Sequence, residues 1–254
     1  MSALKSRIGI VTGGAGGIGR GAARALAGAG AHVVVADIDT LRGQETVDEI
    51  HATGGSATFV RTDVSDAEQV SHLVNGTVER HGRLDCAVNA AGIEFEATLL
   101  HDETEADYER MMDVNVRSIF LCLRAQLAVM VDQPGGGSIV AIASTNAHRP
   151  QPRTPLYSAS KHAVLGLVRA TALDYAAKGV RINAISPGAI DTPMLRGAID
   201  RRGGNPADFA RVLNPMRRFG DPTEVGQAAL WLCSDASSFT TGTTLAVDGG
   251  FLAG

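Results

Sequence analysis

Short apolar runs alternate with amphipathic stretches along almost all of the 254 residues. The apolar runs are rich in Val, Ile and Ala and have the length of buried strands, whereas the stretches between most of them have helical spacing. This alternation is typical of βαβ units. We therefore expect an α/β fold: one doubly wound domain over residues 1–254, with helices on both sides of a seven-stranded parallel sheet. The strands are expected near residues 8–12, 32–37, 57–61, 84–90, 138–143, 180–186 and 243–247.

A glycine-rich loop, Thr12-Gly-Gly-Ala-Gly-Gly-Ile-Gly19, follows the first predicted strand and precedes a helix. In this context Gly13 permits the tight turn, and Gly17 lets the backbone approach a pyrophosphate. Gly19 lets the helix pack closely on its strand, and the phosphates meet free N–H groups at the helix N-terminus. The loop therefore predicts a Rossmann-type domain that binds a dinucleotide.

Asp37 ends the second predicted strand, eighteen residues after Gly19. An acidic side chain at about this distance binds the adenosine ribose hydroxyls in dinucleotide folds, and it repels a 2′-phosphate. Neither Ile38 nor residues 14–16 offers an arginine or lysine to such a phosphate. NAD is therefore the expected cofactor, rather than NADP. The alternative is that Asp37 only begins a turn with Asp39.

Three residues between positions 144 and 161 have the chemistry for proton transfer. Tyr157 and Lys161 are four residues apart and share one face of a predicted helix, so the ammonium group is expected near the phenol. A nearby cation lowers an acidic pKa by about 1–3 units, which would bring the pKa of Tyr157 toward working pH. Such a tyrosine can exchange a proton with an alcohol or ketone oxygen. Ser144 precedes it by thirteen residues.

With these motifs the chain resembles the classical short-chain dehydrogenase/reductase family from its first strand to its C-terminus. The resemblance implies that Tyr157 is the general acid and base and that Ser144 holds the substrate oxygen. It also implies that Lys161 and Asn115 complete the catalytic set. The cofactor-binding residues that it implies are Gly13, Gly17, Ile18, Gly19, Asp37, Asp63, Val64, Asn89, Ala90, Gly92, Tyr157, Lys161, Pro187, Gly188, Ile190 and Thr192.

Four of these polar residues also have a structural interpretation. Asn89 could bridge backbone groups between strands, which is a role that the family also gives it. Asn115 could be a buried amide bonded to a helix carbonyl. Asp63 could only shape the turn before the next helix, and Thr192 could only close a turn. The family also implies a homotetramer, formed through the two long helices near residues 105–131 and 155–178 and the last strand.

Two variable segments are expected to select the substrate. Residues 145–155 include three prolines, which restrict the backbone, and the side chains of His148, Arg149 and Arg153. These three groups could meet polar or anionic substrate atoms, or the arginines could simply be solvated. Residues 189–219 contain six arginines and three aspartates and are expected to form a substrate lid. Its arginines favour an anionic substrate or only solubilise the surface.

Glu94 lies just beyond the segment Asn89-Ala-Ala-Gly92. From there its carboxylate could accept hydrogen bonds from substrate hydroxyls, as similar glucose dehydrogenases of the family are thought to do, and this would favour a polyol or sugar. The alternative is a solvent-exposed loop acid beside Glu96. The substrate-binding residues that we expect are Glu94, Ser144, His148 and Tyr157.

Charge and composition narrow the class of ligand. A net charge of −4 and a pI near 6.0 give no electrostatic basis for binding nucleic acid, so a small-molecule alcohol or ketone is the simpler substrate. No apolar run approaches the roughly 18 residues of a membrane span, and a cytoplasmic protein is expected. Cys86, Cys122 and Cys233 are scattered among mostly apolar neighbours, which predicts buried thiols rather than disulfides or a metal site.

The sequence therefore predicts an NAD-dependent dehydrogenase of a secondary alcohol, with a cyclic alcohol, a polyol or sugar, or a steroid-like ring as substrate. One alternative is a 3-oxoacyl-carrier-protein reductase, an activity that usually uses NADPH, so Asp37 counts against it. Another is a protein that senses a dinucleotide without turnover. The complete set of Asn115, Ser144, Tyr157 and Lys161 counts against that alternative.

Overall fold

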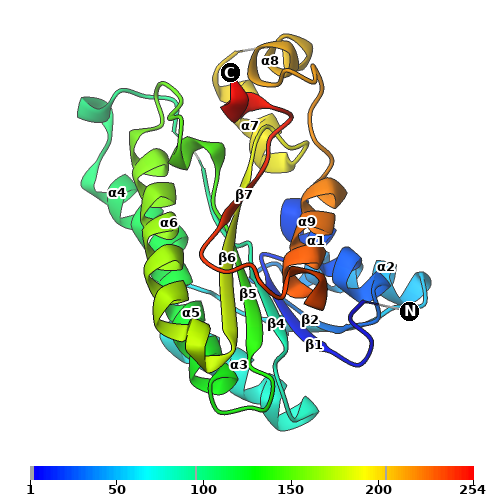
Figure 1. Cartoon of the computed structure of the whole chain (residues 1–254). Coiled ribbons are helices and arrows are strands. Elements are labelled where there is room, and N and C mark those ends of the chain that lie inside the picture. The colour runs from blue at the N-terminus through cyan, green and yellow to red at the C-terminus, as the bar shows by residue number, and fades with distance from the viewer. Residues whose placement is uncertain (1–2, 95, 204) are drawn as a thin grey trace.

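Seven parallel strands form one sheet in the order β3-β2-β1-β4-β5-β6-β7 (Figure 1). The structure is a computed structural model that describes residues 3–94, 96–203 and 205–254. The sequence prediction of a seven-stranded parallel sheet is confirmed, with strand ends shifted by at most a few residues. The strands are β1 (Ile8–Thr12), β2 (His32–Asp37), β3 (Ser56–Arg61), β4 (Cys86–Asn89), β5 (Gly137–Ile142), β6 (Val180–Pro187) and β7 (Thr244–Val247).

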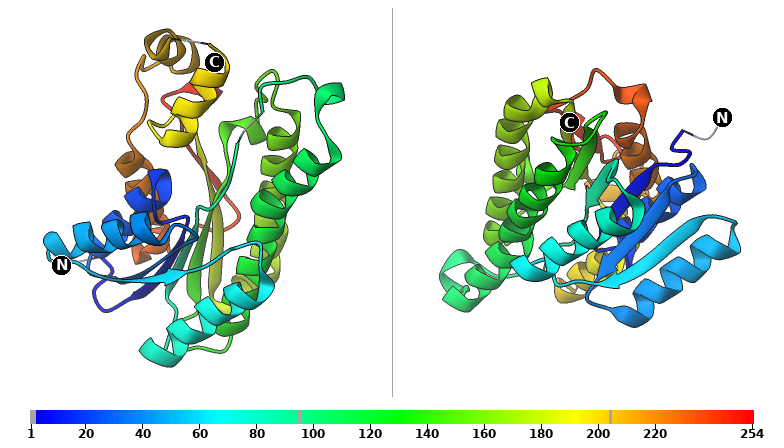
Figure 2. Two further views of the ribbon diagram at one scale, coloured as in Figure 1. Left: turned by 180° about the vertical axis from the view of Figure 1, so that it is seen from behind. Right: turned by 90° about the horizontal axis from the view of Figure 1, so that it is seen from below.

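Helices cover both faces of this sheet, as two further views show (Figure 2). One face is covered by α1 (Gly17–Gly28), α2 (Thr40–Ala52) and α9 (Pro222–Cys233). The other face is covered by α3 (Ala67–His81), α5 (Ser118–Met130) and α6 (Pro155–Tyr175). Each face has its own buried apolar cluster, as expected for parallel strands that are buried on both sides. Val164, Leu165 and Val168 of α6 lie in the second cluster, so they belong to the core of the chain.

The helices α1 and α9 pack unusually closely because glycines line their contact. A Cβ atom at Gly21 would lie 2.4 Å from the carbonyl oxygen of Pro222. A Cβ atom at Gly226 would lie 2.5 Å from the carbonyl oxygen of Gly21. Any side chain at either position would therefore push apart the helix that follows the glycine-rich loop and the helix that covers it.

The long helix expected over residues 105–131 is interrupted. It consists of α4 (Glu105–Met112), a π-helical turn over Asp113–Arg117, and α5. Asn115 lies in the π-helical turn, and its side chain bonds to the backbone of Ile93 in a different segment. A π-turn widens a helix locally and is common at functional sites.

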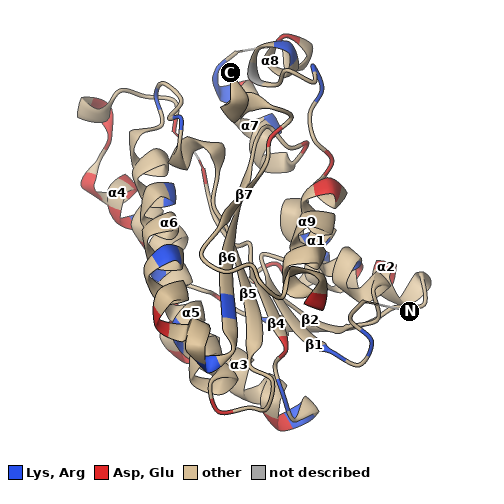
Figure 3. Cartoon of the chain, in the orientation of Figure 1, with Lys and Arg blue, Asp and Glu red and all other residues tan. Residues whose placement is uncertain are grey.

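Two short helices, α7 (Pro193–Arg201) and α8 (Pro206–Leu213), occupy the 189–219 segment. They lie beyond the carboxyl ends of the strands, at the top of Figure 1. Basic and acidic residues are spread over the helices on both sides of the sheet (Figure 3). Cys86, Cys122 and Cys233 are buried free thiols, so the prediction that they are buried is confirmed. In the part of the chain that the structure describes, no helix combines the length and apolarity needed to cross a membrane.

Candidate active site

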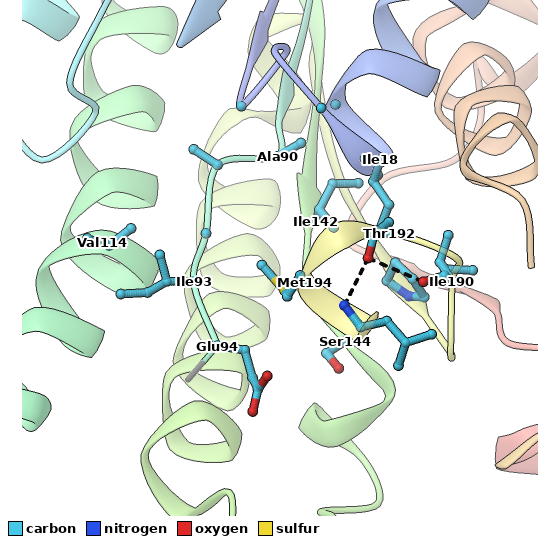
Figure 4. A pocket seen from close by; sticks show the side chains of 18 of the residues that line it. Ile18, Ala90, Ile93, Glu94, Val114, Ile142, Ser144, Ile190, Thr192 and Met194 are labelled. Carbon is cyan, nitrogen blue, oxygen red and sulfur yellow. Dashed lines mark hydrogen bonds between the residues drawn. The ribbon is translucent and has the colours of Figure 1, made fainter. Parts of the chain in front are cut away.

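A pocket of about 760 Å³ opens at the carboxyl ends of the strands. Figure 4 shows Glu94, Ser144 and Thr192 among the side chains that line it. This is where ligands bind in doubly wound sheets, because the strand order reverses beside β1. The sequence-predicted residues that line the pocket are Gly13, Gly17, Ile18, Gly19, Asp37, Asp63, Val64, Ala90, Gly92, Glu94, Ser144, Tyr157, Lys161, Pro187, Gly188, Ile190 and Thr192.

The glycine-rich loop leaves room for a diphosphate. Gly13 has a φ of 67°, and a Cβ atom there would lie 2.7 Å from the backbone nitrogen of Ala91. Gly17 has a φ of 49°, and its Cβ would lie 3.1 Å from Cγ2 of Thr192 across the pocket. The helix α1 follows Gly16, which provides no side-chain cap, so the first N–H groups of the helix have no side-chain acceptor. The loop therefore fits the diphosphate of a dinucleotide.

Asp37 lies at the other end of the pocket and also shapes the local backbone. Its Oδ2 accepts a hydrogen bond from the backbone N–H of Ala15 at 3.0 Å, and its Oδ1 accepts one from that of Asp39 at 3.0 Å. Asp37 therefore forms the expected turn with Asp39 and also lines the pocket. Arg42 lines the same end, and its Nε lies 3.7 Å from Oδ2 of Asp39.

Asp63 likewise has two roles, one in the local backbone turn and one in the lining of the pocket. Its Oδ1 accepts hydrogen bonds from the backbone N–H of Ser65 at 2.9 Å and from the Ser65 hydroxyl at 2.7 Å. The side chain thus shapes the turn before α3, while Asp63 and Val64 both line the pocket. Thr192 caps α7 by accepting a hydrogen bond from the Leu195 N–H at 3.2 Å, and it also faces the pocket.

The structure brings Ser144, Tyr157 and Lys161 together at the floor of the pocket. Ser144 follows β5, and Tyr157 lies in the first turns of α6. Nζ of Lys161 lies 5.6 Å from the centre of the Tyr157 ring and donates a hydrogen bond to the Ile142 carbonyl at 3.0 Å. A hydrogen bond with the Ser144 hydroxyl favours the ionised form of Tyr157.

The acidity of the Tyr157 phenol differs from the sequence-based expectation. Burial raises the pKa of Tyr157 to about 12, although its hydrogen bond with Ser144 opposes this shift. Burial also lowers the pKa of Lys161 to about 8. The expectation that Lys161 would bring the phenol pKa down is therefore wrong for this structure, because removal from water raises the pKa and the group that opposes this shift is Ser144. Lys161 still remains largely protonated at neutral pH.

Asn115 lies beneath the pocket rather than on its wall. Its Oδ1 accepts a hydrogen bond from the Ile93 N–H at 2.8 Å, and its Nδ2 donates to the Ile93 carbonyl at 2.9 Å and to the Ser160 hydroxyl at 3.1 Å. It thereby joins the π-helical turn to the segment after β4 and to α6. A Cβ atom on Gly92 would meet both Oδ1 of Asn115, at 3.2 Å, and Nζ of Lys161, at 3.5 Å.

Two residues expected in the site are placed elsewhere. Asn89 is buried, and its amide exchanges two hydrogen bonds with that of Gln126 on α5, at 2.8 and 3.0 Å. It therefore links a strand to a helix instead of bridging strands or facing the pocket. His148 is exposed, and its Nε2 lies 3.1 Å from the Ser186 hydroxyl, outside the set of residues that line the pocket. The direction of each side chain depends on packing that the sequence motif does not encode.

Glu94 is not the exposed loop acid of the alternative interpretation. Its side chain is 8% exposed, and its Oε2 accepts a hydrogen bond from Nη2 of Arg201 at 2.7 Å. Its Oε1 is buried and has no hydrogen-bond partner among the residues described. Burial raises the pKa of this carboxyl, while Arg201 and Arg202 oppose the shift. Glu94 thus presents an unused acceptor in a pocket lined by Ser144 and Tyr157.

Glu96 is a residue whose role the sequence did not indicate. It is 2% exposed, and its two oxygens accept hydrogen bonds from the backbone N–H groups of Leu156, at 2.9 Å, and Tyr157, at 2.6 Å. Burial raises the pKa of Glu96, and the two N–H donors oppose this. The N-cap residue of α6, Thr154, makes no side-chain cap bond. Glu96 therefore caps the helix that carries Tyr157, and no local pattern around position 96 could have revealed it.

Phe251 also lines the pocket without having been predicted. Arg149, which was expected to be solvated or near substrate, lies over its ring at 4.9 Å from the centre. The same guanidinium donates hydrogen bonds to the carbonyl oxygens of Phe251, at 3.2 Å, and Gly254, at 2.6 Å. Arg149 therefore fixes an aromatic wall of the pocket, a contact over a hundred residues in sequence.

Comparison with known proteins agrees with this geometry. Residues 13–252 match a family model described as enoyl-(acyl carrier protein) reductase. A short chain dehydrogenase/reductase of Aspergillus oryzae is 39% identical over 97% of this chain and 95% of its own length. A 2,5-dichloro-2,5-cyclohexadiene-1,4-diol dehydrogenase of Sphingobium indicum is 42% identical over 100% of both chains. The crystal structure of levodione reductase has a TM-score of 0.93 at 35% identity, covering 98% of this chain and 99% of that one. The chain therefore belongs to the short-chain dehydrogenase/reductase family of oxidoreductases, whose members use NAD or NADP.

Proposed function

We propose that this protein is an NAD-dependent dehydrogenase that interconverts a cyclic secondary alcohol and its ketone. The observation that carries the proposal is the placement of Ser144, Tyr157 and Lys161 in one pocket with the glycine-rich loop. The loop fits a diphosphate, and the three side chains supply a hydrogen-bond donor, a proton carrier and a cation.

The chain's own residues then perform the proton chemistry. When bound, the nicotinamide ring supplies the acceptor or donor of a hydride. In oxidation Tyr157 Oη removes the hydroxyl proton of the substrate, and in reduction it returns that proton to the ketone oxygen. Ser144 donates a hydrogen bond to the same oxygen and fixes its position. The Lys161 ammonium, 5.6 Å from the centre of the Tyr157 ring, would hydrogen-bond the ribose of the nicotinamide nucleotide when the cofactor is bound. Asn115 holds the segment after β4 against α6, so it acts through positioning.

The preference for NAD is supported by Asp37. Its carboxylate lines the adenosine end of the pocket, where it would accept hydrogen bonds from the ribose hydroxyls and repel a 2′-phosphate. The variant Asp37→Ser should raise the ratio of kcat/KM with NADP to that with NAD by at least about tenfold, since two charges a few ångströms apart interact by about 1–4 kcal/mol. Asp48→Ser, on the exposed side of α2, is the control and should leave the ratio unchanged. An unchanged ratio in the Asp37 variant would refute this assignment.

A ring substrate with a second hydroxyl is supported by Glu94. Its unpartnered Oε1 can accept a hydrogen bond from a hydroxyl remote from the reacting carbon. The relative from Sphingobium indicum is named for a cyclic diol, which fits this acceptor. Glu94→Gln should therefore raise KM for cyclic diols more than for the matching mono-alcohols. Equal changes for both substrates would count against a direct contact.

The reaction is tested by following the absorbance of reduced nicotinamide with a panel of cyclic alcohols, polyols and acyl ketones. Wild-type protein should reduce NAD with a cyclic secondary alcohol, and Tyr157→Phe should abolish turnover while retaining cofactor binding. Ser144→Ala should lower kcat by about a hundredfold or more. Reduction of acyl thioesters with NADPH, or cofactor binding without any turnover, would overturn the proposal in favour of an acyl-carrier-protein reductase or a dinucleotide sensor.

We also propose that the protein is a cytoplasmic homotetramer and that residues 189–219 act as a lid over the substrate. The lid is supported by Met194, Leu195 and Ala198 of α7, which line the pocket, and by the Arg201–Glu94 ion pair that ties α7 to the segment after β4. The tetramer is supported by the family resemblance.

A further inference from the structure

A second cavity, of about 510 Å³, lies beside the substrate end of the pocket. Gln151 and Arg202 line both cavities, so the two adjoin. Among the residues that the structure describes, no acidic side chain lines the second cavity. Its lining consists of Ala97, Gln151, Pro152, Arg153, Arg201 and Arg202.

The three arginines of this cavity differ in the hydrogen bonds and ion pairs that their guanidinium groups make. Arg201 is paired with Glu94 at 2.7 Å. Arg153 donates a hydrogen bond only to the Ala97 carbonyl, at 3.3 Å, and its own backbone has a φ of 61°, in the left-handed region that a non-glycine residue rarely adopts. The half-buried guanidinium of Arg202 makes no hydrogen bond or ion pair with any residue described here.

The surrounding charges leave an excess of positive charge. Arg202 interacts electrostatically with two carboxylates: Glu94, which Arg201 already binds, and Glu96, whose oxygens both bind backbone N–H groups of α6. Both oxygens of Glu96 and Oε2 of Glu94 therefore have partners, and Oε1 of Glu94, which lines the main pocket, is the acceptor that these two carboxylates leave unused. A half-buried guanidinium that makes no hydrogen bond or ion pair favours an anion, because arginine binds a carboxylate through two parallel hydrogen bonds. The small excess suits one negative charge rather than a doubly charged phosphate.

We propose that Arg202 and Arg153 form a subsite for a carboxylate on the substrate. The inference rests on the proposed alcohol dehydrogenase function and specifies its substrate as a hydroxylated ring that carries a carboxylate. The hydroxyl reacts at Tyr157 and Ser144, and the carboxylate reaches the adjoining cavity past Gln151. The lid segment thereby recognises the substrate as well as covering it, since Arg202 directly follows α7.

The test compares ring isomers of hydroxycyclohexanecarboxylate with their methyl esters, which keep the ring and the hydroxyl but lack the charge. Wild-type protein should prefer the acid of at least one isomer by about tenfold or more in kcat/KM, the size expected for one charge-assisted contact. Arg202→Gln should remove this preference by raising KM for the acid and leaving the ester unchanged. Arg153→Gln should weaken the preference in the same direction.

Arg196→Gln is the control, because Arg196 lies on α7, the helix that Arg202 follows, is paired with Asp191 and does not line either cavity. It should leave the preference intact. Equal rates for acid and ester, or equal losses for both in Arg202→Gln, would overturn the subsite while Tyr157-dependent turnover of the ester upheld the dehydrogenase.

A binding measurement separates the two proposals if neither compound is turned over. Calorimetric titration of cyclohexanecarboxylate into the NAD-loaded protein should give saturable binding that Arg202→Gln weakens by about tenfold. Binding that is absent in the wild type, or unaffected by the substitution, would overturn the subsite independently of activity.

Discussion

At the residue scale, Glu96 connects the cofactor side of the pocket to the catalytic helix. It follows the segment after β4, which contributes Ala90 and Gly92 to the pocket, and it binds the first free N–H groups of α6. Because Tyr157 supplies one of those N–H groups, the position of its side chain depends on this contact. Glu96 is thus a positioning residue for the proton carrier.

Replacing Glu96 with glutamine should reduce both stability and turnover. The amide keeps one acceptor but directs an NH₂ group at a backbone N–H, leaving a buried donor unsatisfied at a cost of about 1–3 kcal/mol. We expect a lower Tm, a lower kcat and an unchanged Kd for NAD. Pre-steady-state rates at several pH values should also show a displaced Tyr157 ionisation. Glu79→Gln, on the exposed side of α3, should change none of these. A fall in Tm with normal kcat and pH profile would reduce Glu96 to a purely structural cap.

Individual site residues were predictable where the backbone imposes their position. Gly13, Gly17 and Tyr157 line the pocket because a tight turn and a helix repeat determine where they lie. Asn89 and His148 were not predictable in the same way, because neither side chain faces the pocket and each finds a polar partner elsewhere. The predicted direction of the Tyr157 pKa shift was wrong, because the sequence spacing reveals the neighbouring lysine but not how deeply the phenol is buried.

At the element scale, β2 and α3 meet through two histidines at the amino-terminal edge of the sheet. The rings of His32 and His81 lie 4.4 Å apart, and Nε2 of His81 is buried without a partner among the described residues. Burial lowers the pKa of both, and for His32 the neighbouring His81 lowers it further. The folded protein therefore favours their neutral forms.

This pair should make stability fall in acid. Because the folded-state pKa values lie below the unfolded value of about 6.5, the unfolded chain binds more protons, and stability decreases as pH falls through that value. We expect Tm to drop between about pH 7.5 and pH 5.5. His81→Gln should make this drop smaller, and His72→Gln, on the exposed side of α3, should not. A wild-type Tm that is constant over this range would contradict the assignment.

The lid should be the first segment that a protease cuts. Only Ala198 and Ile199 of α7 are buried, and the segment holds six arginines. Limited trypsin digestion followed by mass spectrometry should give initial cleavage within residues 189–219. NAD together with a substrate analogue should slow it several-fold, while cleavage after exposed Arg80 of α3 keeps its rate. Equal protection at both places would indicate general stabilisation instead of lid closure.

Helices and strands were predicted well where their burial produces a recognisable apolar pattern in the sequence. Parallel strands covered on both faces appear as continuous apolar runs, which is why all seven were found. The π-helical turn at Asp113–Arg117 could not be predicted from the apolar pattern, which continues through it, and its residue Asn115 makes a tertiary contact with Ile93. The cap that Glu96 gives α6 was missed for the same reason.

At the scale of the whole molecule, apolar side chains remain exposed on the helices through which the proposed homotetramer would assemble. Leu173 of α6 is 83% exposed, and Phe120 of α5 is 47% exposed. The strand β7 forms one end of the sheet and has a free edge in the single chain. These surfaces are consistent with a buried position in the proposed homotetramer.

Light scattering after gel filtration should therefore give the mass of four chains. Leu173→Glu should shift it toward dimers or monomers, because a charge would be buried at the interface. Leu41→Glu is the matched control: Leu41 is 73% exposed but lies on α2, away from these helices. A monomeric wild type, or a tetramer that Leu173→Glu leaves intact, would exclude α6 as the contact at this position.

The close contact between α1 and α9 at Gly21 and Gly226 has a consequence for folding during synthesis of the chain. The helix α1 packs on the sheet and also against residues 222–233, so the surface that contacts α9 stays open to water until nearly the whole chain has left the ribosome. The first half of the sequence contains every glycine of the loop but lacks the helix that packs on α1, so we expect it to bind NAD poorly by itself. Nascent chains that stop before α9 should accordingly bind chaperones and not NAD. The ability to bind the cofactor should appear in one step, once α9 has been synthesised.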